Sequence, residues 1–408
     1  MTRTQLLILS SLSSVMMLFL SACIPAENSL GESKSIRVQI PVSDSSVVSG
    51  TVETDYSLKV VTLENVYSTT ELQGQFAKFF YAPSSTEKSL AGLNPLSFFL
   101  KTSANVYIPK NENTAFMATI YYHIQSLKKM SDLAGFVQEE KPLSIGLATQ
   151  VVDPTMKTNR AFYDGNRDSI LIVPYTKSEL PIAVNSGILA HEYFHSLFFK
   201  TVLQKAQTGN KKLSESLQLH LSEAKNLFEI ETVEDASMTV EELSNRIYLN
   251  SLNEGLADFW AWLYTKDSNF LKWSLSEFSE DRRLNVKPEV REYRNFQGSI
   301  YENGTQFARL LKSIADDLAE PQIMTTVIKE FLVQLSAENV ELKSEETLNT
   351  GSLYLFLGQS DKIKLDENNC DLLNKNITKM QNEKSYSCEK QTDGYFKLIK
   401  QNEKQNEK

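Results

Sequence analysis

The spacing of apolar residues changes along the chain and predicts strands first and helices later. Over 36–110, apolar and polar residues alternate in short runs, a pattern typical of strands with one buried face. Over 115–133, apolar residues recur at intervals of three and four, which predicts a helix. Apolar runs over 143–152 and 161–175 predict strands of a further sheet. A β-rich N-terminal region therefore precedes an α/β region.

The second half of the chain has mainly helical spacing. Apolar residues at 188–198 predict a largely buried helix, with Asn185 or Ser186 as its cap. The charged helical pattern over 203–247 indicates an inserted helical hairpin, which could serve as a scaffold or as a lid. Helical spacing returns from 304 to about 335. Strands followed by helices predict an α+β fold.

Length, charge and apolar content narrow the class of protein. The chain has 408 residues, of which 41% are hydrophobic, and this is enough for two or three domains with a sizeable core. The net charge of -9 argues against a nucleic acid as partner. Beyond the N-terminal segment, no apolar run is long enough to span a bilayer.

The sequence His-Glu-Tyr-Phe-His at 191–195 carries the clearest chemistry. Residues four apart share one face of a helix, so His191 and His195 can reach one metal ion. This is the H-E-x-x-H pattern of zinc proteases, and it places Glu192 where it can activate a metal-bound water. The chain has only 4 histidines, so a chance match is improbable.

A catalytic zinc site requires a third protein ligand. Glu254 and Asp258 lie four residues apart in an apolar and aromatic segment, so they share a helix face. We expect Glu254 to bind the metal and Asp258 to orient a ligating histidine through its free ring nitrogen. The alternative is a solvated acidic face, which the apolar surroundings disfavour.

The H-E-x-x-H motif and the downstream N-E-x-x-x-D motif together resemble the gluzincin metallopeptidases, most closely the thermolysin-like family. The resemblance covers about 115–311. It implies a zincin-type catalytic domain, in which a mixed sheet with an antiparallel edge strand and an active-site helix is followed by a mainly helical lobe. It also implies one catalytic Zn2+ and a peptide or protein substrate.

The resemblance extends upstream to the run that begins Asn159-Arg160-Ala161, which is similar to the edge strand that binds extended substrate in that family. By resemblance, Arg160 and Ala161 present backbone and side chain to a peptide, and an unpaired strand edge offers the hydrogen bonds for this. Arg160 departs from the family pattern, which has Asn at this place. An ordinary hairpin turning at 164–165 is the alternative.

Further residues of the site are assigned by resemblance alone. Tyr301 stands where the thermolysin-like family has a histidine that steadies the oxyanion, and its hydroxyl can also donate a hydrogen bond. Arg283, followed by Pro288, resembles the arginine segment that binds the substrate carbonyl, although Arg282 is an equal contender. Tyr248 is only a guess for the family's second active-site tyrosine.

These assignments predict a zinc metallopeptidase of the endopeptidase type. His191, His195 and Glu254 would hold the ion, and Glu192 would act as the general base. The alternative is a non-catalytic lipoprotein that uses a zincin fold as a binding or assembly scaffold. The presence of Glu192 speaks against it, because a structural zinc site needs no base.

The N-terminus predicts export. A basic residue, an apolar run and Leu20-Ser21-Ala22-Cys23 form a secretory signal whose end resembles the bacterial lipobox. We expect cleavage before Cys23, lipidation of that cysteine and a membrane anchor. Ile24 after the cysteine favours the outer membrane by the convention for such lipoproteins. An unmodified thiol in an ordinary signal peptide is the alternative.

The two remaining cysteines, Cys370 and Cys388, could form a disulfide in an exported protein or remain free thiols. His123 and His220 lie outside the motifs and are expected to be structural or surface residues. The predicted organisation runs as follows: a signal peptide at 1–22, a tether at 23–35, a β-rich region at 36–110, a catalytic α/β subdomain at 111–202, a helical insertion at 203–250, a helical subdomain with the third ligand at 251–360, and a C-terminal region with a disordered tail at 361–408.

Overall fold

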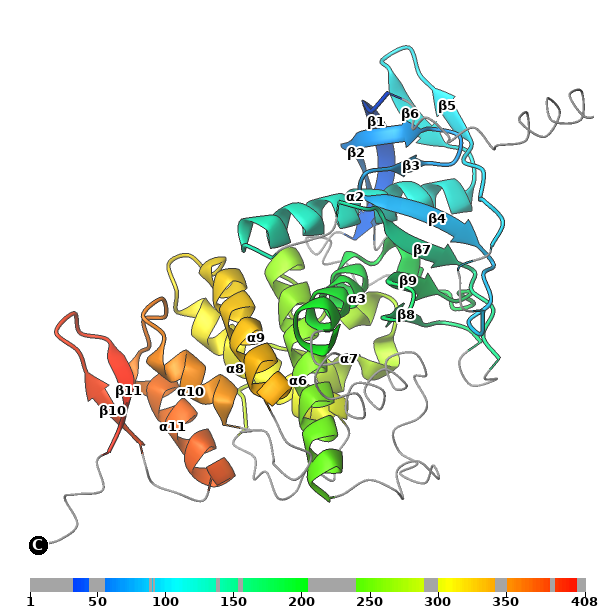
Figure 1. The fold of residues 1–408 in the computed structure, drawn as a ribbon. Helices are drawn as coiled ribbons and strands as arrows, with labels where there is room; N and C mark the ends of the chain where they lie inside the picture. The colour runs from blue at the N-terminus through cyan, green and yellow to red at the C-terminus, as the bar shows by residue number, and fades with distance from the viewer. Residues whose placement is uncertain are drawn as a thin grey trace, which may run out of the picture.

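The computed structural model describes most of the chain between residues 32 and 401. The described ranges are 32–43, 56–87, 90, 92–136, 140–152, 157–204, 240–289, 300–341, 351–381 and 386–401. The predicted signal peptide, Cys23, His220, most of the predicted insertion and the C-terminal tail lie outside them. Figure 1 shows the strands β1 to β9 at one end of the described molecule and α8 to α11, with the β10-β11 hairpin, at the other, and α3 and α6 lie between them.

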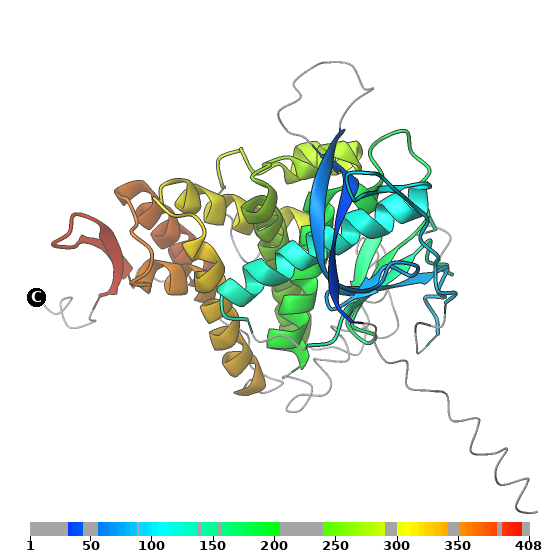
Figure 2. The same cartoon turned by 90° about the horizontal axis from the view of Figure 1, so that it is seen from above.

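The first sheet has five strands in the order β3-β2-β1-β6-β5. Alternating residues of β1, such as Val38 and Ile40, are fully buried beneath helix α2, which crosses the strands in Figure 2. Strand β1 starts at Lys34, which lies inside the range predicted as a tether. The bounds are β1 Lys34–Ser43, β2 Tyr56–Ser68, β3 Gln73–Gly74, β5 Phe99–Lys101, β6 Val106–Pro109 and α2 Glu112–Leu133.

The second sheet is mixed and has the order β4-β7-β9-β8. Its first three strands run parallel, and β8 pairs antiparallel with β9 at one edge. These elements establish an α+β fold with mixed and antiparallel pairing. The bounds are β4 Ala77–Tyr81, β7 Leu143–Leu147, β8 Ala161–Asp164 and β9 Ser169–Ile172.

Two of the predicted divisions fall within a sheet or a helix of the structure. Strand β4 belongs to the predicted N-terminal region, yet it pairs with β7, so the division at 110 cuts through a sheet. Helix α6 runs without interruption over Val240–Thr265, so the division at 250 falls inside a helix. In both cases the structure joins segments that the sequence pattern had assigned to separate units.

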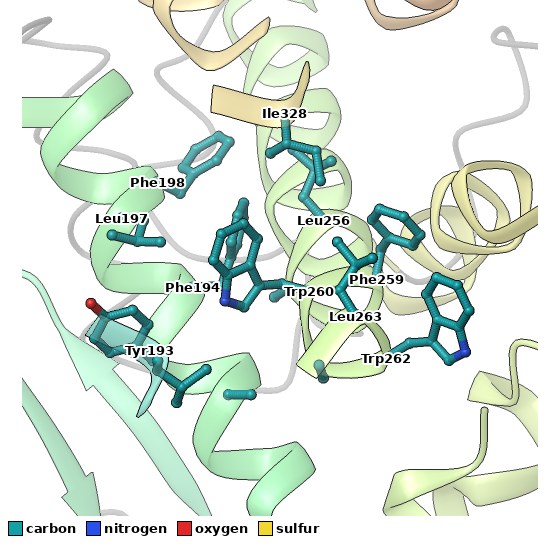
Figure 3. Packing of buried hydrophobic residues seen from close by; sticks show 14 of the residues in the cluster. Tyr193, Phe194, Leu197, Phe198, Leu256, Phe259, Trp260, Trp262, Leu263 and Ile328 are labelled. Carbon is teal, nitrogen blue, oxygen red and sulfur yellow. The ribbon is translucent and has the colours of Figure 1, made fainter. Parts of the chain in front are cut away.

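Helix α3, Ser186–Phe198, and helix α6 form the centre of the molecule. Figure 3 shows Phe194 of α3 close to Trp260 of α6, with ring centroids 5.4 Å apart. Both residues are fully buried. Because α3 and α6 pack together through this apolar contact, polar side chains of the two helices lie close to each other.

Further helices complete the core and the C-terminal end. Helix α8 crosses α6 where Gly255 meets Gly304, and a Cβ on Gly255 would overlap the carbonyl oxygen of Gly304.

Cys370 and Cys388 are joined by a disulfide that links α11 to β10. Of the described helices, none combines the length and apolar character needed to cross a bilayer. The remaining bounds are η3 Ile182–Val184, η4 Phe199–Leu203, η6 Phe270–Trp273, α7 Ser276–Arg282, α8 Ile300–Asp316, α9 Ile323–Glu341, α10 Ser352–Gln359, α11 Glu367–Gln381, β10 Tyr386–Lys390 and β11 Phe396–Lys400.

Candidate metal centre

Helix α3 presents both histidines on a buried face. Its N-cap is Asn185, whose side chain accepts hydrogen bonds from the backbone of Gly187 and Ile188. The amide nitrogen of the same Asn185 donates to the Phe270 carbonyl at 3.0 Å, which ties the start of the helix to a neighbouring segment. A helix anchored in this way is a rigid platform for metal ligands.

Three side chains converge between α3 and α6: those of His191, His195 and Glu254, which form a group able to hold a metal ion. The two histidine Nε2 atoms lie 3.0 Å apart. The Glu254 oxygens lie 3.3 Å from Nε2 of His191 and 3.6 Å from Nε2 of His195. Ligands of one tetrahedral zinc ion, each about 2.0–2.2 Å from it, are spaced by about 3.3–3.6 Å. The two nitrogen–oxygen distances, one to Oε2 and one to Oε1 of Glu254, fall in this range, and the two nitrogens are slightly closer together. Two imidazoles and one carboxylate are a donor set that catalytic zinc takes.

Each imidazole is held through its second nitrogen. Asp258 Oδ1 lies 3.0 Å from His191 Nδ1, and Asn253 Oδ1 lies 3.0 Å from His195 Nδ1. Because an amide oxygen only accepts hydrogen bonds, His195 donates from Nδ1 and its Nε2 keeps a free lone pair. The arrangement corresponds to the outer partners that orient histidine ligands in metal sites.

Burial and neighbouring charge set the protonation of the three groups. Burial alone would lower the pKa of His191, but Asp258 and Glu254 outweigh it and raise that pKa to about 9. For His195, burial and the nearby charge of His191 lower the pKa to about 4. Burial opposes ionisation of Glu254, yet the two histidines and Arg282 hold its pKa at about 2. A metal ion binding here would therefore displace the proton of His191.

Glu192 is buried beside the three ligands, and its Oε2 has no hydrogen-bond partner among the described residues. Its carboxylate accepts a hydrogen bond from the backbone of Tyr163 in β8, but burial dominates and raises its pKa to about 8. A carboxyl group that titrates near neutral pH is suited to exchange protons with a reactant. A buried carboxyl oxygen of this kind is suited to bind a water or a substrate at the centre.

The structure brings Arg282 rather than Arg283 to the centre. The Arg282 guanidinium lies 2.6 Å from Asp258 and 3.4 Å from Glu254. Arg283, which by resemblance would bind the substrate carbonyl, pairs instead with Glu280 at 2.9 Å, and its side chain is 43% exposed. The reason is that α7 ends at Arg282 and Arg283 has an extended backbone, so the two side chains diverge.

Tyr301 lies on the first turn of α8 next to this arginine, whose guanidinium carbon is 4.8 Å from the ring centroid. The residue is 37% exposed. The negative charge of Glu254 and burial of the hydroxyl both raise the pKa of Tyr301 above its usual range. The hydroxyl is therefore protonated at neutral pH and can donate a hydrogen bond.

Among the described residues, β8 is the last strand of its sheet, and its outer edge lies on the side of the centre. The Val173 amide donates to the Arg160 carbonyl at 3.1 Å. Hydrogen bonding alternates in antiparallel pairs, so the amide and carbonyl of Ala161 point away from β9. Arg160 and Ala161 thus lie at an edge that can accept an extended chain, next to the Tyr163 backbone that contacts Glu192.

Two other residues considered from the sequence lie away from the centre. Tyr248 is fully buried, and its ring packs against Phe307 with centroids 6.1 Å apart. His123 is also buried, and its Nδ1 lies 2.8 Å from the Tyr264 hydroxyl. Asn253 is the first residue of the N-E-x-x-x-D motif, but no role was predicted for it, although a polar residue directly before Glu254 in an apolar helix was an available signal.

The chain matches none of the protein-family models and none of the curated proteins with which it was compared.

Proposed function

We propose that this protein is a zinc-dependent peptidase of the gluzincin type with a zincin-type catalytic domain. The observation that carries the proposal is the convergence of His191, His195 and Glu254 beside a buried carboxyl oxygen of Glu192 that has no partner among the described residues. A site that only stabilised the fold would have no use for such a group, which is costly to bury.

The side chains have distinct roles in this proposal. When bound, zinc would supply Lewis-acid activation of water and of the substrate carbonyl. Glu192 accepts a proton from the attacking water and returns it to the leaving amine. The Tyr301 hydroxyl donates a hydrogen bond to the developing oxyanion. Asp258 and Asn253 keep both imidazoles oriented.

The substrate in this proposal is an extended peptide that pairs with β8 at Arg160 and Ala161. The open backbone of Ala161 supplies hydrogen bonds to any peptide main chain, whatever its side chains. Binding at this edge places the peptide beside the Tyr163 backbone, which contacts Glu192. Because main-chain pairing with a strand edge does not require a free peptide terminus, we expect cleavage within the peptide chain.

Replacement of Glu192 by Gln tests the function. Glu192→Gln should retain zinc, measured by elemental analysis, while turnover of a peptide library falls by about 10²–10⁴. Chelation should abolish cleavage by the wild-type protein, and added zinc should restore it. A zinc-loaded wild-type protein that cleaves no peptide would instead favour the scaffold function.

We also propose that the protein is an exported lipoprotein, anchored at Cys23 and sorted to the outer membrane. The support is the run Leu20-Ser21-Ala22-Cys23 after a short apolar segment. Cys23→Ser should leave a precursor that is uncleaved or a product that is released into the soluble fraction. Fully processed protein that still partitions with membranes would contradict the anchor.

A further inference from the structure

Arg309 of α8 holds the end of α7 by two hydrogen bonds. Its Nε donates to the carbonyl of Arg283 at 2.9 Å, and its Nη2 donates to the carbonyl of Asp281 at 3.0 Å. These two carbonyls belong to the residues on either side of Arg282. Arg309 is only 8% exposed, so its side chain lies in the interior of the protein.

Helix α7 needs such a contact for a physical reason. It spans only Ser276–Arg282, and a helix this short is not stable on its own. The last carbonyl groups of a helix have no partner inside it, and they carry the negative end of the helix dipole. A cationic side chain at this end gives the carbonyls a hydrogen-bond donor and places a positive charge next to the negative end of the dipole. Arg309 of the neighbouring helix α8 is such a side chain.

The next contact leads from α7 into the metal centre. Arg282 donates from Nε and Nη2 to the two oxygens of Asp258, at 3.1 and 2.6 Å. Asp258 lies 3.0 Å from Nδ1 of His191. A continuous series of polar contacts therefore runs from Arg309 through the backbone around Arg282 to a metal-binding imidazole.

Helix α8 also contacts Arg282 from a second point. Tyr301, on the same helix as Arg309, places its ring 4.8 Å from the guanidinium carbon of Arg282. One contact fixes the backbone of Arg282 and the other packs against its side chain. A shift of α8 relative to α7 would consequently move Arg282 away from Asp258 and Glu254.

We propose that Arg309 is a positioning residue of the metal centre, which fixes Arg282 and through it the orientation of Asp258 and His191. The inference rests on the zinc site of the proposed function. Arg309 touches neither a ligand nor a reacting group, so its contribution is to slow the release of zinc and to keep the imidazole aligned. Loss of the direct outer partners of metal ligands typically weakens metal binding by about 10–100-fold. Arg309 acts through Arg282 and Asp258, so we expect an effect at the lower end of this range.

The zinc dissociation rate of the full chain tests the proposal, measured by transfer of zinc to an excess of chromogenic chelator. We expect Arg309→Met to release zinc about tenfold faster than the wild-type protein. Arg309→Lys keeps the charge but lacks the fork of donors, so its rate should fall between the two. Lys312→Met, on the same helix, is the matched control, because Lys312 pairs with Asp316 and should not affect zinc release.

A double-mutant cycle separates positioning from general destabilisation. In an Arg282→Met background, Arg309→Met should change the dissociation rate by less than about twofold, because the residue through which Arg309 acts is gone. An equal effect of Arg309→Met in both backgrounds would overturn the inference, as would a wild-type rate in Arg309→Met. If Arg309→Met does not fold, Arg309→Lys carries the same cycle with the same two outcomes.

These outcomes are distinct from failure of the proposed function. A wild-type protein that binds no zinc would overturn the zinc site itself. A protein that binds zinc and cleaves peptides, yet shows independent effects of Arg282 and Arg309, would retain the function and lose only the positioning role.

Discussion

Asn253 Oδ1 lies 3.0 Å from Nδ1 of His195, and the next residue of the chain, Glu254, directs a carboxylate oxygen to within 3.6 Å of Nε2 of the same ring. Adjacent residues of α6 thus contact both nitrogens of one imidazole. The first sets which nitrogen carries the proton, and the second supplies a further ligand of the proposed zinc site.

Removal of the Asn253 amide should weaken zinc binding. In Asn253→Ala, His195 loses the acceptor that fixes its tautomer, and we expect zinc affinity to fall by about 10–100-fold. Competition with a chelator of known affinity measures this. Asn253→Asp, which keeps an acceptor oxygen, should retain most of the affinity. Equal affinities for Asn253→Ala and the wild-type protein would remove Asn253 from this role.

The crossing of α6 and α8 should tolerate no added methyl group. A Cβ on Gly255 would overlap the carbonyl oxygen of Gly304, and a Cβ on Gly304 would lie 2.7 Å from the Ser251 carbonyl oxygen. We expect Gly255→Ala to lower the free energy of unfolding by about 1–3 kcal/mol, because both neighbours are backbone and cannot move aside. Chemical denaturation measures this.

Glu302→Ala is the control for the helix crossing, because residue 302 lies on the same helix and is exposed. It should change stability by no more than about 0.5 kcal/mol. A Gly255→Ala protein as stable as this control would show that the two helices can separate without loss.

His123 should make the fold less stable as the pH falls. Burial lowers the pKa of His123 to about 4, below its ordinary value of 6.5. Between these values the unfolded chain binds a proton that the folded protein excludes, so stability falls as the pH drops from 6.5 towards 4. The loss at pH 4 is on the order of 3 kcal/mol.

A variant without the titrating group isolates this effect. His123→Phe combined with Tyr264→Phe removes the imidazole and also the hydroxyl that would lose its partner. The stability difference between this variant and the wild-type protein should change with pH between 6.5 and 4 and be constant above 6.5. A pH-independent difference over the whole range would contradict a buried, neutral His123.

Much of the fold and of the site follows from local sequence pattern. The helix at 115–133 and the shared face of His191 and His195 depend on residues within a few turns of each other, and α2 and α3 occupy these positions. The spacing of Glu254 and Asp258 likewise placed both carboxylates on one face of α6, and both contact His191.

What the sequence pattern missed depends on contacts between distant segments. The pairing of β4 with β7 has no local signal, because either strand could join any sheet. The choice between Arg282 and Arg283 depended on where α7 ends, and that end is held by Arg309 from another helix. The end of a helix that is held by another helix can be located only once the helices are packed together.

Anomalous diffraction at the zinc absorption edge, with crystals of the zinc-loaded protein, tests the proposed metal centre most directly. We expect one strong peak about 2.0–2.2 Å from Nε2 of His191, from Nε2 of His195 and from a carboxylate oxygen of Glu254. A peak elsewhere, or a Glu254 side chain directed away from both imidazoles, would contradict it.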